Sequence, residues 1–175
     1  MGFAVFEWFW AMRADLQHVY VVILFLVALR RGAAPERIIT GACVCEALVH
    51  AAYHAVLGGG SVFWHQLNLG HLAIDSTLLA VFMAVAIRAN RVYPLWIGSA
   101  QIIAVMAHVY RFSLTEIDQL AYYVMSIAPS YIQLTAVTLG LAFHMWRRKK
   151  LGSYPSWRSS LPPMPARGPK PLRGG

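Results

Sequence analysis

The sequence is poor in charge, with Asp, Glu, Lys and Arg forming 13% of its 175 residues. This is about half the charged share of an ordinary soluble domain and excludes a disordered acidic or basic chain. Two cysteines are too few for a disulfide-stapled miniprotein, and glycine follows no collagen-like repeat. A P-loop, a GxGxxG loop and an esterase elbow are also missing. The common signatures of nucleotide and acyl-transfer enzymes are therefore lacking.

The charge is also distributed unevenly along the chain. Residues 1–146 contain no lysine, and their seven arginines balance seven acidic residues. The other eight basic residues lie in 147–175, which has no acid, so the net charge of +8 belongs to this C-terminal part. Aromatic residues suited to base stacking are limited there to Tyr154 and Trp157. We therefore expect no nucleic-acid partner.

Long apolar runs take the place of charge, since 58% of the residues are hydrophobic. A helix needs about 20 apolar residues to cross a bilayer. Four stretches approach or meet this length, at about 37–58, 71–88, 92–112 and 129–146. A fifth, 16–29, is short unless its helix is continuous with the aromatic segment 3–10, which otherwise lies in the membrane interface. We predict an all-α fold, an integral membrane bundle of five transmembrane helices within residues 1–150.

The positive charges predict how this bundle is oriented. If the five spans are as above, thirteen Lys and Arg flank one side of the membrane and two flank the other. Cytoplasmic loops carry the excess of positive charge, which predicts an N-terminus outside and a C-terminus in the cytoplasm. Four basic residues directly after the last run are the predicted membrane anchor: Arg147, Arg148, Lys149 and Lys150.

Two segments near the C-terminus have less regular patterns. Residues 114–128 are either an interfacial helix or the outer part of a long last helix that contains Pro129. Residues 151–175 hold six of the nine prolines and have no apolar periodicity. We predict that 151–175 is a disordered cytoplasmic tail, which offers a docking segment for a protein partner.

Ionisable residues within the predicted spans are unusual, because a charge at the centre of a spanning helix costs about 2.5–3.5 kcal/mol. The second span has three such residues at intervals of four, which places them on one helix face. Another two begin the third span, also four apart, and one lies in the fourth. In the predicted orientation they gather in the outer half of the bundle, and they form the candidate site: Glu46, His50, His54, His71, Asp75 and His108.

Three kinds of chemistry suit these residues. In the first, His50 and His54 bind a divalent metal together with Asp75 or Glu46. Alternatively, one histidine from each of two helices, such as His50 or His54 with His108, binds haem. In the second, the histidines and carboxylates exchange protons. In the third, they form hydrogen bonds that hold the helices together, worth about 0.6 kcal/mol each. The sequence leaves these three open.

A resemblance adds an expected location. The segment Arg88-Ala-Asn-Arg-Val-Tyr-Pro-Leu-Trp96, followed by Ala107-His108 and Ala128-Pro-Ser-Tyr131, resembles small multi-pass proteins of bacterial genomes to which no activity is assigned. The resemblance implies a place in the bacterial inner membrane and implies no reaction.

These observations together predict a function of a general kind. We expect a non-enzymatic accessory or interaction subunit in the membrane, with the lipid bilayer and either a protein partner or a second copy of the chain as its partners. The alternative is a haem- or metal-binding redox protein, or a proton-coupled protein, that uses the same histidines.

Overall fold

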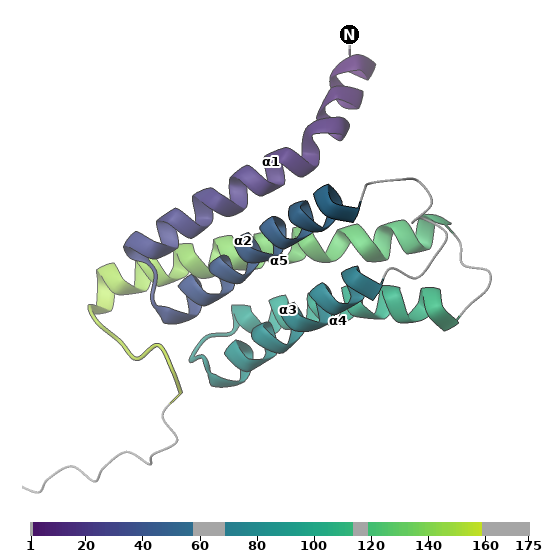
Figure 1. Cartoon of the computed structure of the whole chain (residues 1–175). Helices are drawn as coiled ribbons and strands as arrows, with labels where there is room; N and C mark the ends of the chain where they lie inside the picture. The colour runs from purple at the N-terminus through teal and green to yellow at the C-terminus, as the bar shows by residue number, and fades with distance from the viewer. Residues whose placement is uncertain (1, 58–68, 114–118, 159–175) are drawn as a thin grey trace, which may run out of the picture.

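The computed structural model describes residues 2–57, 69–113 and 119–158. Within them the chain forms five helices, shown in Figure 1: α1 (Gly2–Arg31), α2 (Ala34–Leu57), α3 (Leu69–Arg88), α4 (Tyr93–Ser113) and α5 (Gln119–Leu151). The described ranges contain no strand, and a single isolated bridge joins Ala89 to Trp157. The predicted all-α class with five helices is therefore present.

Two alternatives about helix length are resolved. The aromatic segment 3–10 and the run 16–29 belong to one continuous helix, α1. Pro129 lies inside α5, so the chain from Gln119 onward is the first part of a long last helix. Residues 114–118 lie outside the described ranges.

The start of α2 follows from local sequence. Pro35 occupies the first turn, where a missing N–H costs no hydrogen bond. Three residues after Ala33, the carboxylate of Glu36 turns back, and its Oε2 accepts a hydrogen bond from the Ala33 N–H at 3.0 Å. This is the returning half of a capping box. A tight connection between α1 and α2 is the result.

All described connections between helices lie at one end of the bundle, where α5 also ends (Figure 1). Consecutive helices pack as antiparallel neighbours, and α5 also packs against α2 and α1. We call this end the basic end, because arginines and lysines close three of its helices: Arg30, Arg31, Arg88, Arg148, Lys149 and Lys150. The other end is the distal end.

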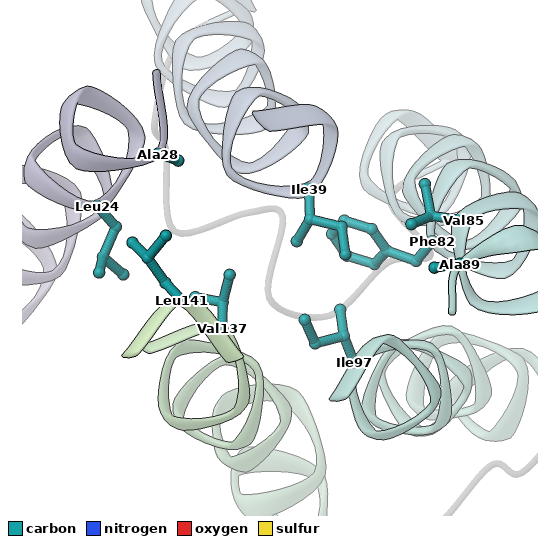
Figure 2. Close-up of a cluster of buried hydrophobic side chains, with 9 residues drawn as sticks. All are labelled: Leu24, Ala28, Ile39, Phe82, Val85, Ala89, Ile97, Val137 and Leu141. Atoms are coloured by element: carbon teal, nitrogen blue, oxygen red, sulfur yellow. The ribbon is translucent and has the colours of Figure 1, made fainter. Parts of the chain in front are cut away.

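The apolar core lies nearer the basic end. Figure 2 shows Phe82 of α3 between Ile39 of α2 and Ile97 of α4, while Leu24 of α1 meets Leu141 of α5. Each of these side chains is nearly or fully buried. Every helix therefore contributes to one core.

The surface of the bundle is unusually apolar. Large hydrophobic side chains are exposed on several helices, for example Val19 (57%), Leu48 (65%) and Phe143 (61%). Conversely, five polar or charged residues of the described ranges are buried: Glu36, Thr40, Arg91, Gln101 and His144. The usual distribution of a soluble domain buries its large apolar side chains and exposes its charges.

One helix in the described part of the chain, α3, is long and apolar enough to cross a membrane. Its most apolar 18-residue window has a mean hydropathy of 1.8, and only 17% of that window is buried. Polar side chains such as Glu46 in α2 and Gln101 in α4 lower the mean hydropathy of other helices. Membrane crossing by each of the five helices stays a prediction.

The chain after α5 returns to the bundle. The Asn90 N–H donates to the Ser156 carbonyl at 3.0 Å, and the Arg158 N–H donates to the Arg88 carbonyl at 2.8 Å. This segment thus lies against the connection between α3 and α4, although residues 151–175 were predicted to be disordered. For 151–158 the prediction is corrected, because backbone hydrogen bonds fix the segment in place. Residues 159–175 lie outside the described ranges.

Candidate functional site

The structure pairs two of the predicted site histidines across α2 and α3. The Nε2 atoms of His50 and His71 are 2.9 Å apart, so one imidazole donates a hydrogen bond and the other accepts it. Their rings meet edge to face, with centroids 4.8 Å apart. The ring of Tyr53 lies edge to face against His71 on its other side. Two imidazoles at this distance are able to share a proton.

A second pair joins α3 to α4. The Nε2 atom of His108 donates to Oδ2 of Asp75 at 2.9 Å. The other carboxylate oxygen, Oδ1, accepts from Nε2 of Gln101 at 3.0 Å, and the same nitrogen reaches the Asp75 carbonyl at 3.1 Å. An imidazole and a carboxylate in this geometry form an ion pair when the imidazole is protonated, and a neutral hydrogen bond when it is not.

Gln101 extends this arrangement to α5. Its Oε1 accepts a hydrogen bond of 2.6 Å from Nε2 of Gln133, and Gln101 itself is 2% exposed. Hydrogen bonds therefore run from α5 through α4 to α3, and the next turn of α3 holds His71 with its partner on α2. We call these six residues the distal polar chain: Gln133, Gln101, Asp75, His108, His71 and His50.

Four of the six predicted site residues thus belong to the distal polar chain. Glu46 is half-buried one turn before His50, and no hydrogen bond links its carboxylate to the described residues. The side chain of His54 lies outside the part that the structure describes. The histidine pair suggested for haem is not formed by His50 and His108, because each bonds to a different partner on α3.

The predicted metal set, His50, His54 and Asp75, has a similar outcome. Among the described residues, no three His, Cys, Asp or Glu side chains come together as ligands of one metal ion. Within that part of the chain such side chains meet in pairs, as His50 does with His71 and Asp75 with His108. The set with His54 stays a prediction.

A second polar cluster lies at the basic end. Oε1 of Glu36 accepts a hydrogen bond of 2.8 Å from Nε of Arg91, and the side chains are 0% and 5% exposed. Nη2 of Arg91 also donates to Nδ1 of His144 at 3.1 Å. A guanidinium has no acceptor, so in this contact the imidazole nitrogen is the acceptor.

Tyr154, from the segment after α5, completes this cluster. Its hydroxyl lies 2.8 Å from Nδ1 of His144, and its ring lies 4.6 Å from the guanidinium carbon of Arg91. A cation over an aromatic face is attracted by the ring's quadrupole. The basic-end cluster therefore consists of four residues: Glu36, Arg91, His144 and Tyr154.

Sequence reasoning missed the basic-end cluster. Glu36 is not among the predicted site residues, Arg91 counts only as one of the positive charges that orient the chain, and Tyr154 lies in the predicted disordered tail. The available signal was the position of Glu36 in the first turn of an apolar helix, because a carboxylate that is buried there needs a partner. Nothing in the sequence indicated which arginine would be that partner.

The predicted membrane anchor is exposed at the basic end. Arg147, Arg148, Lys149 and Lys150 lie near the C-terminal end of α5 and are exposed. The Lys150 ammonium lies 4.5 Å from the centre of the Trp146 ring, which is itself exposed. A ring and a cation in this arrangement suit a membrane–water interface.

Comparison with protein-family models, with curated proteins and with solved structures finds no match for this chain.

Proposed function

We propose that the chain is a five-span membrane protein of the bacterial inner membrane, a non-enzymatic subunit whose distal polar chain holds its helices together. The observation that carries this proposal is the reversed polarity of the bundle. In the described part of the bundle the charged or amide side chains of Glu36, Arg91 and Gln101 are buried, while many large apolar side chains are exposed along its helices. Lipid is the solvent that suits such a surface.

The helix α3 supports the same reading. A long apolar helix in a soluble protein is usually a buried core helix, whereas only 17% of the most apolar window of α3 is buried. A cleaved leader lies at the start of a chain, whereas α3 lies in the middle of this one. The remaining explanation is contact with a membrane or with an apolar partner.

The orientation follows from the basic end. Its arginines and lysines favour the cytoplasmic side, and the distal polar chain then lies in the outer half of the membrane. Its interhelical hydrogen bonds link α2 to α3, α3 to α4 and α4 to α5. At an average near 0.6 kcal/mol per bond, these bonds fix which helices are neighbours more than they add stability.

The first test is topology. Alkaline phosphatase and green fluorescent protein would be fused in turn after residues 62, 90 and 158 of the chain expressed in a bacterium. We expect phosphatase activity only after 62, and fluorescence only after 90 and 158. Resistance of the unfused chain to extraction from membranes by alkaline carbonate is the accompanying control. Release by carbonate, or phosphatase activity at 90, would contradict the proposal.

A second candidate function, metal binding, is favoured by one specific distance. Two imidazole nitrogens bound to one tetrahedral zinc ion, at about 2.0–2.1 Å each, are about 3.3 Å apart. The 2.9 Å between the Nε2 atoms of His50 and His71 needs only a small adjustment to reach this separation. The pair comes from two helices, so a bound metal would link them.

This candidate is tested with cobalt(II) as a spectroscopic substitute for zinc. The purified protein in mild detergent would be titrated and followed by its visible absorption. Metal binding predicts a saturable absorption band that is lost in His50→Ala and kept in His18→Ala, a matched control because His18 is exposed on α1. A band that persists in His50→Ala, or no band at all, would remove the candidate.

A further inference from the structure

A groove of about 510 Å³ lies between α1 and α5, away from both polar clusters. Its walls are mainly apolar, with Leu16 and Tyr20 on α1 and with Tyr131 and Leu134 on α5. Arg13 and Gln17 are the polar side chains that α1 contributes. Of the packed helix pairs, α1 and α5 have the least contact, and Figure 1 shows the N-terminal part of α1 rising away from the other helices.

One hydrogen bond sets the register of the groove. The hydroxyl groups of Tyr20 and Thr138 are 2.9 Å apart, joining residues that are 118 positions apart in the sequence. Both helices run toward the basic end. Residues at the same height on α1 and α5 therefore differ by the same 118 positions in the sequence. One turn further from the basic end, Gln17 is level with Thr135. By the same offset Leu16 corresponds to Leu134 and Arg13 to Tyr131, and all four residues line the groove.

The position of Arg13 along α1 matches the thickness of a bilayer. Arg13 and Arg30 are 17 residues apart on one helix, which corresponds to about 26 Å at 1.5 Å per residue. The hydrocarbon core of a membrane is about 30 Å thick. If Arg30 lies at the cytoplasmic boundary, Arg13 lies near the outer boundary, at the depth of lipid headgroups.

We propose that this groove binds an anionic phospholipid, with an acyl chain along its apolar walls and the phosphate against Arg13. The inference rests on the proposed membrane location. Arg13 supplies the positive charge that complements a phosphate, and Gln17 supplies an amide donor one turn away.

The chemistry of the groove favours a lipid over a soluble anion. A soluble phosphate has no apolar part to bury, whereas the walls below Arg13 offer Leu16, Leu134 and the two tyrosine rings. The hydroxyl groups of Tyr20 and Thr138 are hydrogen-bonded to each other. At that depth a bound molecule therefore makes mainly apolar contacts with the groove.

The test measures lipid selectivity of the full chain in mild detergent by native mass spectrometry. Phosphatidylglycerol and phosphatidylcholine with identical acyl chains would compete at equal concentration. We expect about fivefold preference for phosphatidylglycerol, since one basic residue near a headgroup contributes about 1 kcal/mol. Arg13→Gln should remove the preference, and Arg88→Gln, at the basic end, should keep it. Equal retention of both lipids by the unchanged protein would overturn the proposal.

A second variant tests the apolar part of the groove. Thr135→Trp places a large ring among its walls and should reduce retention of both lipids, while Val19→Trp, on an exposed part of α1 that does not line the groove, should not. Glycerol 3-phosphate serves as the headgroup without chains. If it competes as well as the whole lipid, the groove binds phosphate and the lipid assignment is wrong. If the topology test fails, the proposed function is wrong; if only selectivity is lacking, this inference alone is wrong.

Discussion

The distal polar chain and the basic-end cluster use similar residues in different surroundings. Each joins at least three parts of the chain through carboxylate, imidazole and amide or guanidinium groups. The Asp75 and His108 side chains are 26% and 15% exposed, whereas those of Glu36 and Arg91 are 0% and 5% exposed. A buried charge is strongly destabilising when its partner is missing. The members of a partly exposed pair are able to change their hydrogen-bond partners or their protonation.

This difference separates two roles. The basic-end cluster fixes α2, the α3–α4 connection, α5 and the following segment in one arrangement, so we expect it to determine stability. The distal polar chain retains access to its surroundings and includes the donor pair of His50 and His71. Between the two lies the apolar core of Figure 2. If the two roles are as distinct as these exposed fractions indicate, substitutions in the basic-end cluster should lower the free energy of unfolding more than substitutions in the distal polar chain.

The largest expected effect is at the buried ion pair. Arg91→Met leaves the Glu36 carboxylate buried without its partner, and breaking a buried pair in this way costs about 3–5 kcal/mol. We expect this loss in the free energy of unfolding, measured by denaturation of the protein in mild detergent. Arg88→Met removes an equal charge from an exposed site and is the control.

The double variant Glu36→Gln with Arg91→Met sharpens this prediction. It removes both charges, so it should recover part of the stability that Arg91→Met loses, because no unpaired ion remains. A double variant as unstable as the sum of its single changes would mean that the two residues do not act as a pair.

The next effect concerns how closely α4 and α5 approach near the basic end. A Cβ added at Gly140 would lie 2.5 Å from Cδ1 and Cγ of the Tyr93 ring. Gly140→Ala should therefore cost about 1–3 kcal/mol of unfolding free energy, as overpacking does. At Gly98 the nearest atom is the flexible Met83 sulfur at 3.0 Å, so Gly98→Ala should cost less. Equal losses would show that Tyr93 moves aside freely.

The sequence made one of these regions predictable and the other not. His71 and Asp75 are four apart on one helix, and so are Glu46 and His50, so helical periodicity alone places each pair on one face. Short connections then bring the faces of consecutive helices together. Gln101 carries no charge and is not among the predicted site residues. Its role as the link between Asp75 and Gln133 depends on how α3, α4 and α5 pack.

The basic-end cluster lacks such a pattern. Glu36, Arg91, His144 and Tyr154 come from four separate parts of the chain, with one residue from each. A single residue has no periodicity, and its partner depends on the fold of everything between. The same reason explains why Tyr154 was placed in a disordered tail, since prolines around it indicate irregular backbone but do not indicate whether that backbone docks.

A smaller effect is expected within the distal polar chain. Gln101→Leu removes the hydrogen bonds to Asp75 and Gln133 while keeping a similar volume. We expect a loss of about 1–2 kcal/mol in unfolding free energy, since interhelical bonds in membranes contribute about 0.6 kcal/mol on average and 1.7 at most. Thr77→Val is the control, because Thr77 is exposed and its hydroxyl bonds within its own helix. A loss above that for Arg91→Met would reverse the comparison between the two regions.

The smallest expected effect separates the docked segment from the cluster that receives it. Tyr154→Phe removes the hydroxyl that bonds to His144 but keeps the ring over Arg91. A net hydrogen bond contributes about 0.5–1.5 kcal/mol, so the loss in unfolding free energy should fall in this range. Tyr154→Ala also removes the ring, and trypsin should then cleave faster after Arg158. If both variants leave cleavage unchanged, the backbone hydrogen bonds of Ser156 and Arg158 hold the segment without Tyr154, and the basic-end cluster ends at His144.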